Sequence, residues 1–441
     1  MTGRHILSEP IVITGIGMIA SVGDDRESVW EAVRQGRSNF RYLRGIHGIA
    51  DDTIVGATVE LPEPLDGRLK VLPLCEIAAA EALEDSGVDL SNLDLDRFGC
   101  SISAHMGDTS WMEEQLGIPL PENRPNWWEQ WFPNTACSMI ARKYGLGGPR
   151  LCNSTACSTS LISIMTAVRS IHDRQCDIML AGGADALDPM FVAGFDRMRV
   201  LAKDVDPNRA CRPFDRTRKG FVFGEGSAIF VIERLGHALR RGTRIYAEIK
   251  SISALAQAHH VTGIDADDNA LDYLIQSALK KANVQPSDIG YINAHGTGTV
   301  QNDAAEAAGI SRTFGKATDG LCVSATKSIL GHMINAAGAA ELAVTALGLR
   351  DGFAPPTLNL HDPDPLCTFD CVPCVGRITR FQHALKLSLA FGGHLVAMVL
   401  NRWNDAATGF PYPPMIAPAT YGGGLVGVLN QSPNVDLRRS M

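Results

Sequence analysis

An internal repeat constrains the fold of this chain more than any other feature. The segment 142–157 aligns without gaps with the segment 312–327, so that Cys157 corresponds to Lys327 at an offset of 170 residues. Two further pairs of segments match upstream, 82–88 with 278–284 and 102–105 with 292–295. A repeated supersecondary unit buries its apolar face against its neighbouring copy. The sequence therefore predicts two similar α/β halves.

Hydrophobic patterns predict the first elements of the chain. A β-branched run indicates a strand over 10–20, and a second buried run indicates a strand over 99–104. Apolar periodicity predicts helices over 26–35 and 75–86. The glycines at 15 and 17 lack the third glycine and the later acidic residue of a dinucleotide site, so we interpret them as tight packing of a turn.

Cys157 lies where a run of small residues opens into a predicted helix. The helix is indicated by apolar residues at three- and four-residue steps, namely Leu161, Ile164, Met165, Val168 and Ile171. Ser154 and Thr155 are the expected caps of its start. A cysteine in a first helical turn faces the positive end of the helix dipole, which favours the thiolate. The alternative is a buried cysteine that only fills space.

The repeat brings further reactive residues toward Cys157. Ligands collect beyond the carboxyl ends of strands in α/β sheets, so equivalent strand ends from two halves would meet near a pseudo-twofold axis. The second half places Lys327 and His332 in the loop that corresponds to Cys157. A third loop, after the strand expected at 289–293, carries His295. One nucleophile and two histidines are thereby predicted to converge.

Composition narrows the function classes. The net charge of −8 argues against a nucleic-acid partner and means that an acidic carrier would need a local basic patch. The first ten residues lack an apolar signal region, and no stretch is long enough to span a membrane, so we expect a cytoplasmic protein. The pair Cys371 and Cys374 lacks further metal ligands, and we interpret it as a β-strand with packed thiols, with no metal site.

Several motifs in a fixed order resemble the β-ketoacyl-acyl-carrier-protein synthases of the thiolase superfamily. The resemblance covers roughly Ile11 to Trp403. It is carried by Ser154-Thr155-Ala156-Cys157-Ser158, Asn293-Ala294-His295-Gly296-Thr297-Gly298-Thr299, Lys327-Ser328, Gly331-His332 and Ala390-Phe391-Gly392-Gly393. It implies an α/β, thiolase-like fold in which two duplicated halves form a layered α-β-α-β-α architecture. We divide the chain into an N-terminal half, 1–255, with a Trp-rich insertion at 106–133, a C-terminal half, 256–403, and a Pro/Gly-rich extension, 404–441.

The resemblance also implies a reaction. Cys157 would take an acyl group from a carrier thioester, and His295 and His332 would stabilise the enolate formed when malonyl-acyl-carrier protein loses CO₂. The products would be 3-oxoacyl-acyl-carrier protein, CO₂ and free carrier. Lys327 would hold the histidine loop, with Glu341 as its counter-charge. The implied partners are the acyl carrier protein and a second copy of the chain, and the phosphopantetheine stays on the carrier, so no bound cofactor is expected.

Supporting roles follow for the neighbouring residues, some with alternatives. The backbone amides of Cys157 and Phe391 would form an oxyanion hole, with Phe391 gating the acyl tunnel beside Gly392 and Gly393. Thr297 and Thr299 would bind the pantetheine arm or only complete a turn. The acidic pair Asp303 and Glu306 matches the family or consists of surface charges. His260 and Thr262 lie on a loop that resembles one beside the family's active site, although a solvated loop is the simpler interpretation.

Departures from the family pattern leave the substrate open. Leu389, Ala390 and His394 differ from the usual residues around the gate, and His105 and Met106 replace a more glycine-rich region beside the acyl pocket. A thiolase would need a second catalytic cysteine in the loop of Phe391, which has none. A ketosynthase of a polyketide or specialised acyl pathway and a non-catalytic chain-length partner subunit stay as alternatives to a fatty-acid synthase.

Overall fold

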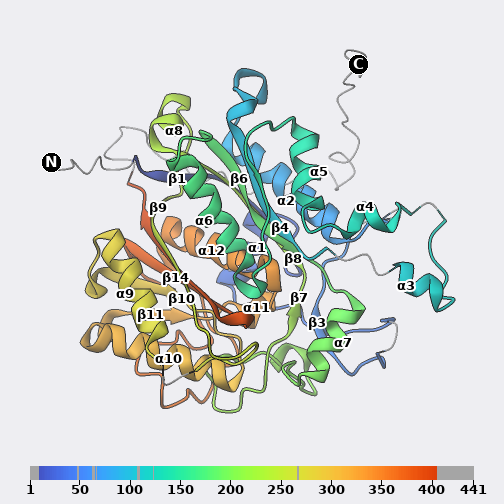
Figure 1. Ribbon diagram of the computed structural model, residues 1–441. Coiled ribbons are helices and arrows are strands. Elements are labelled where there is room, and N and C mark those ends of the chain that lie inside the picture. The colour runs from blue at the N-terminus through green and yellow to red at the C-terminus, as the bar shows by residue number, and fades with distance from the viewer. Residues whose placement is uncertain are drawn as a thin grey trace.

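One ten-stranded sheet organises the computed structural model, which describes residues 9–46, 49–61, 65, 67–106, 110–122, 124–265 and 268–404. In spatial order its strands are β11 (Cys322–Ser324), β10 (Ile289–Asn293), β14 (His383–Ala390), β15 (His394–Arg402), β9 (Ala247–Ala256), β1 (Ile11–Ala20), β8 (Gly226–Arg234), β6 (Ile178–Asp185), β4 (Phe98–Ala104) and β5 (Arg150–Leu151). Only three residue pairs, Ile11–Ile249 to Ile13–Ala247, join β1 to β9. The sheet thus consists of two five-stranded halves with a narrow junction (Figure 1).

The two halves repeat one order of strands. Starting from the junction, β1, β8, β6, β4 and β5 of the first half correspond to β9, β15, β14, β10 and β11 of the second. In each half the two outermost strands pair in parallel, while the two strands nearest the junction pair antiparallel. The predicted duplication is therefore confirmed, and its pseudo-twofold axis passes between β1 and β9.

Helices cover the two half-sheets in layers. On the first half, α2 (Val71–Ser86) contacts β1 and β8, and α5 (Thr135–Tyr144) contacts β4. On the second half, α9 (Ala270–Ala282) contacts β9 and β15, and α10 (Val300–Phe314) contacts α9. Between the half-sheets lie α6 (Thr159–His172) and α12 (Ile334–Asp351), which contact each other. This arrangement confirms the expected α-β-α-β-α layering (Figure 1).

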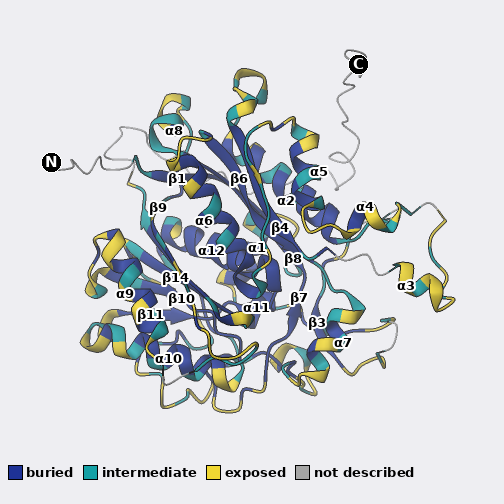
Figure 2. Cartoon of the chain, in the orientation of Figure 1, coloured by how far each residue is buried: buried dark blue, intermediate teal, exposed yellow. Residues whose placement is uncertain are grey.

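The central helix α12 is buried on all sides. Every residue from Ile334 to Leu349 is buried, and Figure 2 shows this helix in dark blue while α9 and α10 keep exposed outer faces. Its small residues allow the close approach of α6, because a Cβ atom at Gly338 would lie 2.7 Å from Cγ of Leu161. A helix that is apolar all round belongs in a core. The alanine- and glycine-rich sequence after His332 therefore gives the two halves a shared core.

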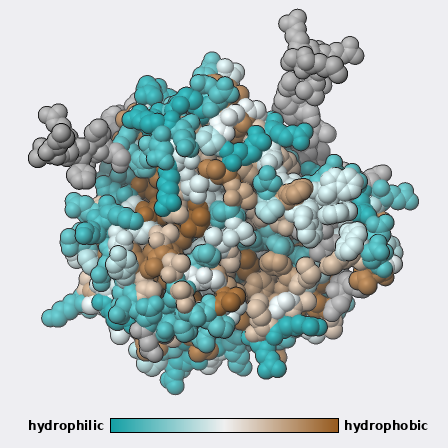
Figure 3. Space-filling model, viewed as in Figure 1, coloured by the Kyte–Doolittle hydropathy of each residue, from teal (hydrophilic) through white to brown (hydrophobic). Residues whose placement is uncertain are grey.

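The remaining elements lie around these layers. They are α1 (Arg26–Arg34), α3 (Ser110–Gln115), α4 (Trp127–Trp131), α7 (Pro189–Arg197), α8 (Leu235–Arg241), α11 (Lys327–Leu330), β2 (Arg41–Tyr42), β3 (Val55–Ala57), β7 (Phe223–Gly224), β12 (Phe353–Ala354) and β13 (Arg377–Ile378). No helix within the described ranges is long and apolar enough to cross a membrane. On the face in Figure 3, hydrophobic residues gather near the middle and hydrophilic residues occupy most of the rim.

The first predicted elements are present, with shifted ends. The strand expected at 10–20 is β1, the helix at 26–35 is α1, and the strand at 99–104 is β4. The helix expected from residue 75 begins at Val71. Gly15 and Gly17 lie in the middle of β1 instead of a turn, and a Cβ atom at either would lie within about 2 Å of a carbonyl oxygen of α2 (2.2 Å from Ala82 and 1.9 Å from Ala78). They pack a helix tightly on a strand.

The expectation of a β-strand over Cys371 to Cys374 is wrong. These residues form a loop in which Val372 and Cys374 have positive φ angles of 47° and 58°. An extended strand requires negative φ, so the predicted strand does not form here. The thiol of Cys371 is buried, and that of Cys374 lies 3.4 Å from the carbonyl oxygen of Leu360.

The Trp-rich insertion contributes two short helices, α3 and α4. Trp127 makes edge-to-face contacts with Trp128 and Trp131. Trp111, Trp128 and Trp131 are each about half exposed. The cluster of Trp127, Trp128 and Trp131 therefore lies at the surface. Figure 1 shows α3 and α4 at the margin of the molecule. Of the predicted extension 404–441, all but the first residue lies outside the described residues.

The predicted boundary between residues 255 and 256 falls at the end of β9. In the sheet, β9 takes the place in the second half that β1 takes in the first. The symmetry of the sheet therefore groups β9 with the C-terminal half.

Candidate active site

Cys157 lies in a single 3-10 turn, Ala156–Ser158, directly before α6. Ala156 takes a positive φ of 48°, a conformation that side chains other than glycine adopt at a cost. The expected capping by Ser154 and Thr155 is wrong: the hydroxyl of Thr155 donates to Oδ1 of Asn153 (2.9 Å), and no side chain caps either helical segment. The first turn of α6 stabilises this segment, because the backbone amide of Thr155 donates to Oγ1 of Thr159 (2.9 Å).

Burial dominates the acidity of this thiol. Desolvation raises the pKa of Cys157 to about 12, although nearby Lys327 and the backbone amides of Phe391 and Cys157 itself lower it. Burial thus outweighs the groups that favour the thiolate, because removing a charge from water costs more than nearby charges and amides return. The thiol needs a partner that takes its proton. The two amides directed at its sulfur are those expected to form the oxyanion hole.

His332 is positioned to accept this proton. Its Nε2 atom lies 3.0 Å from Sγ of Cys157. Burial, followed by the charges of Lys327 and Lys386, lowers the pKa of His332 well below its usual value. A neutral imidazole has a free nitrogen that can accept a proton or a hydrogen bond. The edge of His332 also contacts the ring of Phe221, at a centroid distance of 4.9 Å.

His295 is the second imidazole of the site. Its ring centroid lies 5.5 Å from that of His332, in an edge-to-face arrangement. Nζ of Lys327 lies 3.2 Å from Nδ1 of His295 and donates to its carbonyl oxygen (2.6 Å). Burial and the charge of Lys327 lower the pKa of His295 well below its usual value. The structure thus brings Cys157, His295, His332 and Lys327 together as predicted.

Glu341 joins two buried lysines. Its Oε1 atom lies 2.5 Å from Nζ of Lys327, which agrees with the predicted counter-charge. Its Oε2 atom lies 2.5 Å from Nζ of Lys386, a residue that the sequence analysis missed. Lys386 lies inside an apolar strand pattern, and a single lysine there carries no motif. The signal that could have found it is a lysine within the apolar run 384–390, which lies in the buried strand β14.

The acidic pair is buried and holds the loops of the site. Glu306 accepts from the backbone amides of His295 (2.5 Å) and Gly296 (2.8 Å). Asp303 accepts from the amides of Gly298 (3.1 Å) and Phe214 (2.8 Å). The alternative of solvated surface charges is therefore wrong for both residues. They fix the backbone that carries His295.

The turn predicted to act as the gate lies against Cys157. Phe391 begins the turn Phe391–Gly393, and its ring lies 6.3 Å from that of Phe195, within an apolar cluster. Ser388, also missed by the sequence analysis, donates its hydroxyl to the carbonyl oxygen of Cys157 (3.0 Å). The carbonyl oxygen of Gly393 accepts from the amide of Gln257 (2.8 Å). The gate is thus anchored both to Cys157 and to the neighbouring loop.

The predicted pantetheine ligands form local contacts. The hydroxyls of Thr297 and Thr299 lie 2.9 Å apart, and the amide of Thr299 donates to Oγ1 of Thr297 (3.3 Å), as the turn interpretation expects. His260 is exposed, and its Nδ1 atom accepts from the amide of Thr262 (3.1 Å). Their loop touches the gate, because the amide of Gly392 donates to the carbonyl oxygen of Val261 (2.7 Å).

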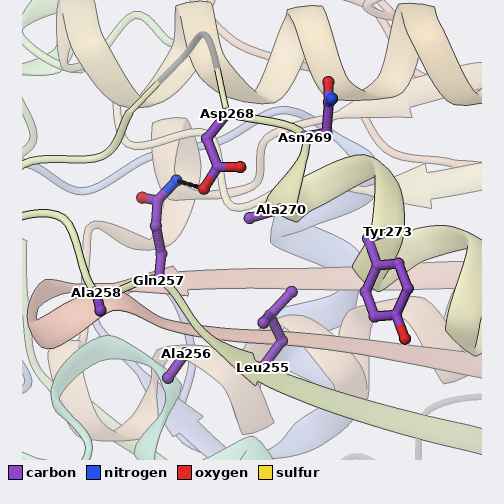
Figure 4. A pocket seen from close by; sticks show the side chains of 8 residues that line it. All are labelled: Leu255, Ala256, Gln257, Ala258, Asp268, Asn269, Ala270 and Tyr273. Atoms are coloured by element: carbon purple, nitrogen blue, oxygen red, sulfur yellow. Dashed lines mark hydrogen bonds between the residues drawn. The ribbon is translucent and has the colours of Figure 1, made fainter.

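A shallow surface hollow lies beside this loop (Figure 4). It is lined by Leu255, Ala256, Gln257, Ala258, Asp268, Asn269, Ala270 and Tyr273. The side chain of Gln257 crosses it and donates to Oδ2 of Asp268 (2.9 Å). No predicted site residue lines it. The hollow therefore adjoins the gate through Gln257 and is distinct from the space around Cys157.

The three reactive side chains could also reach one metal ion. The sulfur of Cys157 and ring nitrogens of His295 and His332 lie within 4.8 Å of one another, and thiolate and imidazole are ligands that zinc accepts. The buried ammonium groups of Lys327 and Lys386 oppose a cation at this place, since like charges repel strongly in a low dielectric. Glu341 pairs with both ammonium groups and offsets one of their two charges. The absence of a metal stays a prediction.

Comparisons with known proteins match this geometry. Residues 71–238 match the family model "Beta-ketoacyl synthase, N-terminal domain", and residues 246–361 match "Beta-ketoacyl synthase, C-terminal domain". Together these matches span more than half of the chain.

Individual relatives fall into two groups. The chain is 35% identical over 409 residues to 3-oxoacyl-[acyl-carrier-protein] synthase 2 of Coxiella burnetii, with 90% of this chain and 99% of the relative covered. It is 35% identical over 421 residues to the tetracenomycin polyketide synthase ketoacyl synthase alpha subunit of Streptomyces glaucescens, with 90% and 98% covered. A solved type II polyketide ketosynthase in complex with its acyl-carrier protein matches with a TM-score of 0.83 at 30% identity, over 90% of this chain and all of that one.

Proposed function

Because the chain belongs to the β-ketoacyl synthase family and is a condensing enzyme of the acyltransferase type, we propose that it is a 3-oxoacyl-[acyl-carrier-protein] synthase. It joins an acyl group bound to Cys157 with a malonyl group by decarboxylative condensation. The observation that carries the proposal is the 3.0 Å contact between the thiol of Cys157 and Nε2 of His332, with His295 beside them. A nucleophile, a base and a second hydrogen-bonding imidazole are what the two half-reactions require.

In the first half-reaction the thiol becomes an acyl acceptor. His332 takes the proton of Cys157, and the sulfur attacks the carbonyl carbon of the acyl carrier thioester. The amides of Cys157 and Phe391 stabilise the negative oxygen of the tetrahedral intermediate. The carbon–sulfur bond to the carrier then breaks, and the carrier thiolate takes the proton from His332. The enzyme is left with an acyl thioester and a neutral histidine pair.

In the second half-reaction a malonyl thioester loses its carboxylate as CO₂. The electron pair of the broken bond moves into an enolate, whose oxygen needs hydrogen-bond donors in a dry site. His295 and His332 supply them, and Lys327 holds His295 at its Nδ1 side. The enolate carbon attacks the acyl carbon on Cys157, a carbon–carbon bond forms, and the thiolate of Cys157 leaves and takes up a proton from the solvent. The product is 3-oxoacyl-acyl-carrier protein.

The acyl carrier protein delivers both substrates. A related ketosynthase was solved in complex with its acyl-carrier protein, which supports this partner. His260 and Thr262 lie on the loop that touches the gate turn through Val261. Together with Thr297 and Thr299 they are the proposed contacts of the pantetheine arm. Their polar side chains suit the amides of that arm.

A second copy of the chain is the proposed structural partner. The strand β5 is an outer strand of the sheet, and outer strands invite pairing with another chain. The neighbouring α4 exposes Trp128 and Trp131, and aromatic residues are enriched in interfaces. Replacement of Trp131 by Glu should convert a dimer to monomers in sedimentation velocity. An unchanged dimer would place the interface elsewhere.

The product pathway has two candidates. Relatives that are 3-oxoacyl synthases favour fatty-acid synthesis, whereas relatives from polyketide synthases favour a specialised acyl pathway. Some similar structures are ketosynthases with a chain-length factor, so a non-catalytic partner subunit is the remaining alternative. The retained Cys157, His295 and His332 support a catalytic chain.

One experiment separates a catalytic chain from a non-catalytic partner subunit. The purified chain is incubated with acyl carrier protein loaded with a short acyl group and with acyl carrier protein loaded with a malonyl group. The carrier-bound product is identified by mass spectrometry. A 3-oxoacyl carrier two carbons longer than the acyl group supports the proposal. Acylation of the chain without any malonyl-dependent product would contradict it and favour the role of a partner subunit.

A further inference from the structure

Lys386 is a fully buried cation that the mechanism above does not use. It lies in β14, and its Nζ atom donates to the carbonyl oxygens of Leu387 (2.5 Å) and Ala294 (3.3 Å). It also lies 2.5 Å from Oε2 of Glu341. A lysine is rarely fully buried, and burying its charge is costly unless it is paired. Its position therefore calls for an explanation beyond packing.

The contacts of Lys386 converge on the backbone that carries His295. Its ammonium group binds the carbonyl oxygen of Ala294, the residue directly before His295. Through Glu341 it is also tied to Lys327, which holds Nδ1 of His295. Lys386 and Lys327 thus hold one histidine from two sides, with one carboxylate between them.

The charges around this cluster balance only when Lys386 is protonated. The charged groups that face it are Lys327 from α11, Glu341 from α12 and Glu306 from α10. The two histidines that feel its charge, His295 and His332, are held neutral. Burial raises the pKa of Glu306 to about 7, so above that pH two ammonium groups offset two carboxylates. Without the proton on Lys386, the buried cluster carries one excess negative charge beside the place where the enolate forms.

We propose that Lys386 is a positioning residue for the malonyl half-reaction, whose ammonium group supplies the second positive charge behind the histidine pair. This inference rests on the proposed function. An excess negative charge in a low-dielectric site opposes a developing enolate, so decarboxylation requires protonated Lys386. Acyl transfer to Cys157 depends less on this charge, because its oxyanion is stabilised by the amides of Cys157 and Phe391.

The proposal has a pH signature. Burial lowers the pKa of Lys386 below its usual value, and Lys327 lowers it further, although Glu341 opposes the shift. Lys386 therefore loses its proton at a pH where an exposed lysine keeps it. The rate of CO₂ release by the natural chain should fall as the pH rises above the pKa of Lys386. The rate of Cys157 labelling should not fall in the same pH range.

The test compares Lys386→Met with Lys250→Met, a lysine of β9 that pairs with Glu248 away from the site. For each protein, CO₂ release from malonyl carrier and labelling of Cys157 from an acyl carrier are measured from about pH 6 to about pH 10. We expect Lys386→Met to slow CO₂ release roughly tenfold at neutral pH and to lose the alkaline fall, with labelling largely kept. Lys250→Met should follow the natural chain in both assays.

The outcomes separate the two claims. If the natural chain shows no alkaline fall in CO₂ release relative to labelling, the role of Lys386 is refuted, even where Lys386→Met does not fold. The same conclusion follows if the folded variant keeps both the rate and the alkaline fall. If the natural chain is not labelled at all, the proposed function fails instead.

Discussion

Nε2 of His332 lies 3.0 Å from the sulfur of Cys157, although 175 positions separate the two residues in the chain. The thiol comes from the first copy of the repeat and the imidazole from the second. Neither half therefore contains a complete site. The packing of α6 against α12 holds the two residues together. Burial raises the pKa of this thiol to about 12, so under the proposed function the thiol gives its proton to His332.

The two histidines should therefore differ in their effects on the half-reactions. His332→Ala removes the proton acceptor of Cys157 and should slow both labelling and CO₂ release, by roughly 10²- to 10⁴-fold where proton transfer limits the rate. His295→Ala should slow CO₂ release and leave labelling largely intact. Single-turnover labelling and CO₂ release from malonyl carrier measure the two effects. Equal losses in both assays for both variants would refute this division of roles.

Glu306→Gln should loosen the loop of His295. The carboxylate accepts from two backbone amides, whereas an amide side chain offers one acceptor oxygen and presents donors on its other side. We expect a loss of about 1–3 kcal/mol in the free energy of unfolding and slower CO₂ release. Glu84→Gln, at an exposed position of α2, is the control. Denaturant unfolding that gives equal stabilities for both variants would contradict the buried role.

Gly393→Ala should disturb the gate turn. Gly393 has a φ of +76°, and a Cβ atom there would lie 1.9 Å from the carbonyl oxygen of Gln257. The left-handed conformation alone costs about 1–2 kcal/mol for other residues, and the clash adds to it. Gly194→Ala in α7 meets no atom within 4 Å and should be neutral. The melting temperature and the rate of Cys157 labelling should fall for Gly393→Ala only. Equal values for the two variants would argue against a rigid gate.

The sequence predicted the parts of the site that motifs mark. The duplication, the layered fold and the meeting of Cys157 with His295 and His332 followed from the repeat and from the ordered motifs. The acidity of Cys157 did not, because it depends on burial, which no local pattern reports. Lys386 and Ser388 were missed for a similar reason: single polar residues in an apolar strand gain their roles only from what the fold places opposite them. The strand expected at Cys371 does not form, because Val372 and Cys374 adopt positive φ angles.

The buried carboxyl of Asp185 should make the free energy of unfolding fall as the pH rises. Burial raises the pKa of this carboxyl from 3.8 to about 8 in the folded chain. Its contribution to stability is fully present below about pH 3.8 and is lost progressively as the pH rises to about 8, because the unfolded chain releases the proton first. Asp185→Asn should flatten this slope in denaturant unfolding at several pH values. An unchanged slope would show that Asp185 is ionised in the folded protein.

The central claim is that Cys157 is the acyl acceptor of this chain. A labelled acyl carrier is incubated with the natural chain, with Cys157→Ala and with Cys137→Ala, the buried cysteine of a second Thr-Ala-Cys sequence in α5. The label bound to protein is then measured, and the modified peptide is identified by mass spectrometry. We predict label on the natural chain and on Cys137→Ala, within the peptide of Cys157, and none on Cys157→Ala. Undiminished labelling of Cys157→Ala would contradict the account.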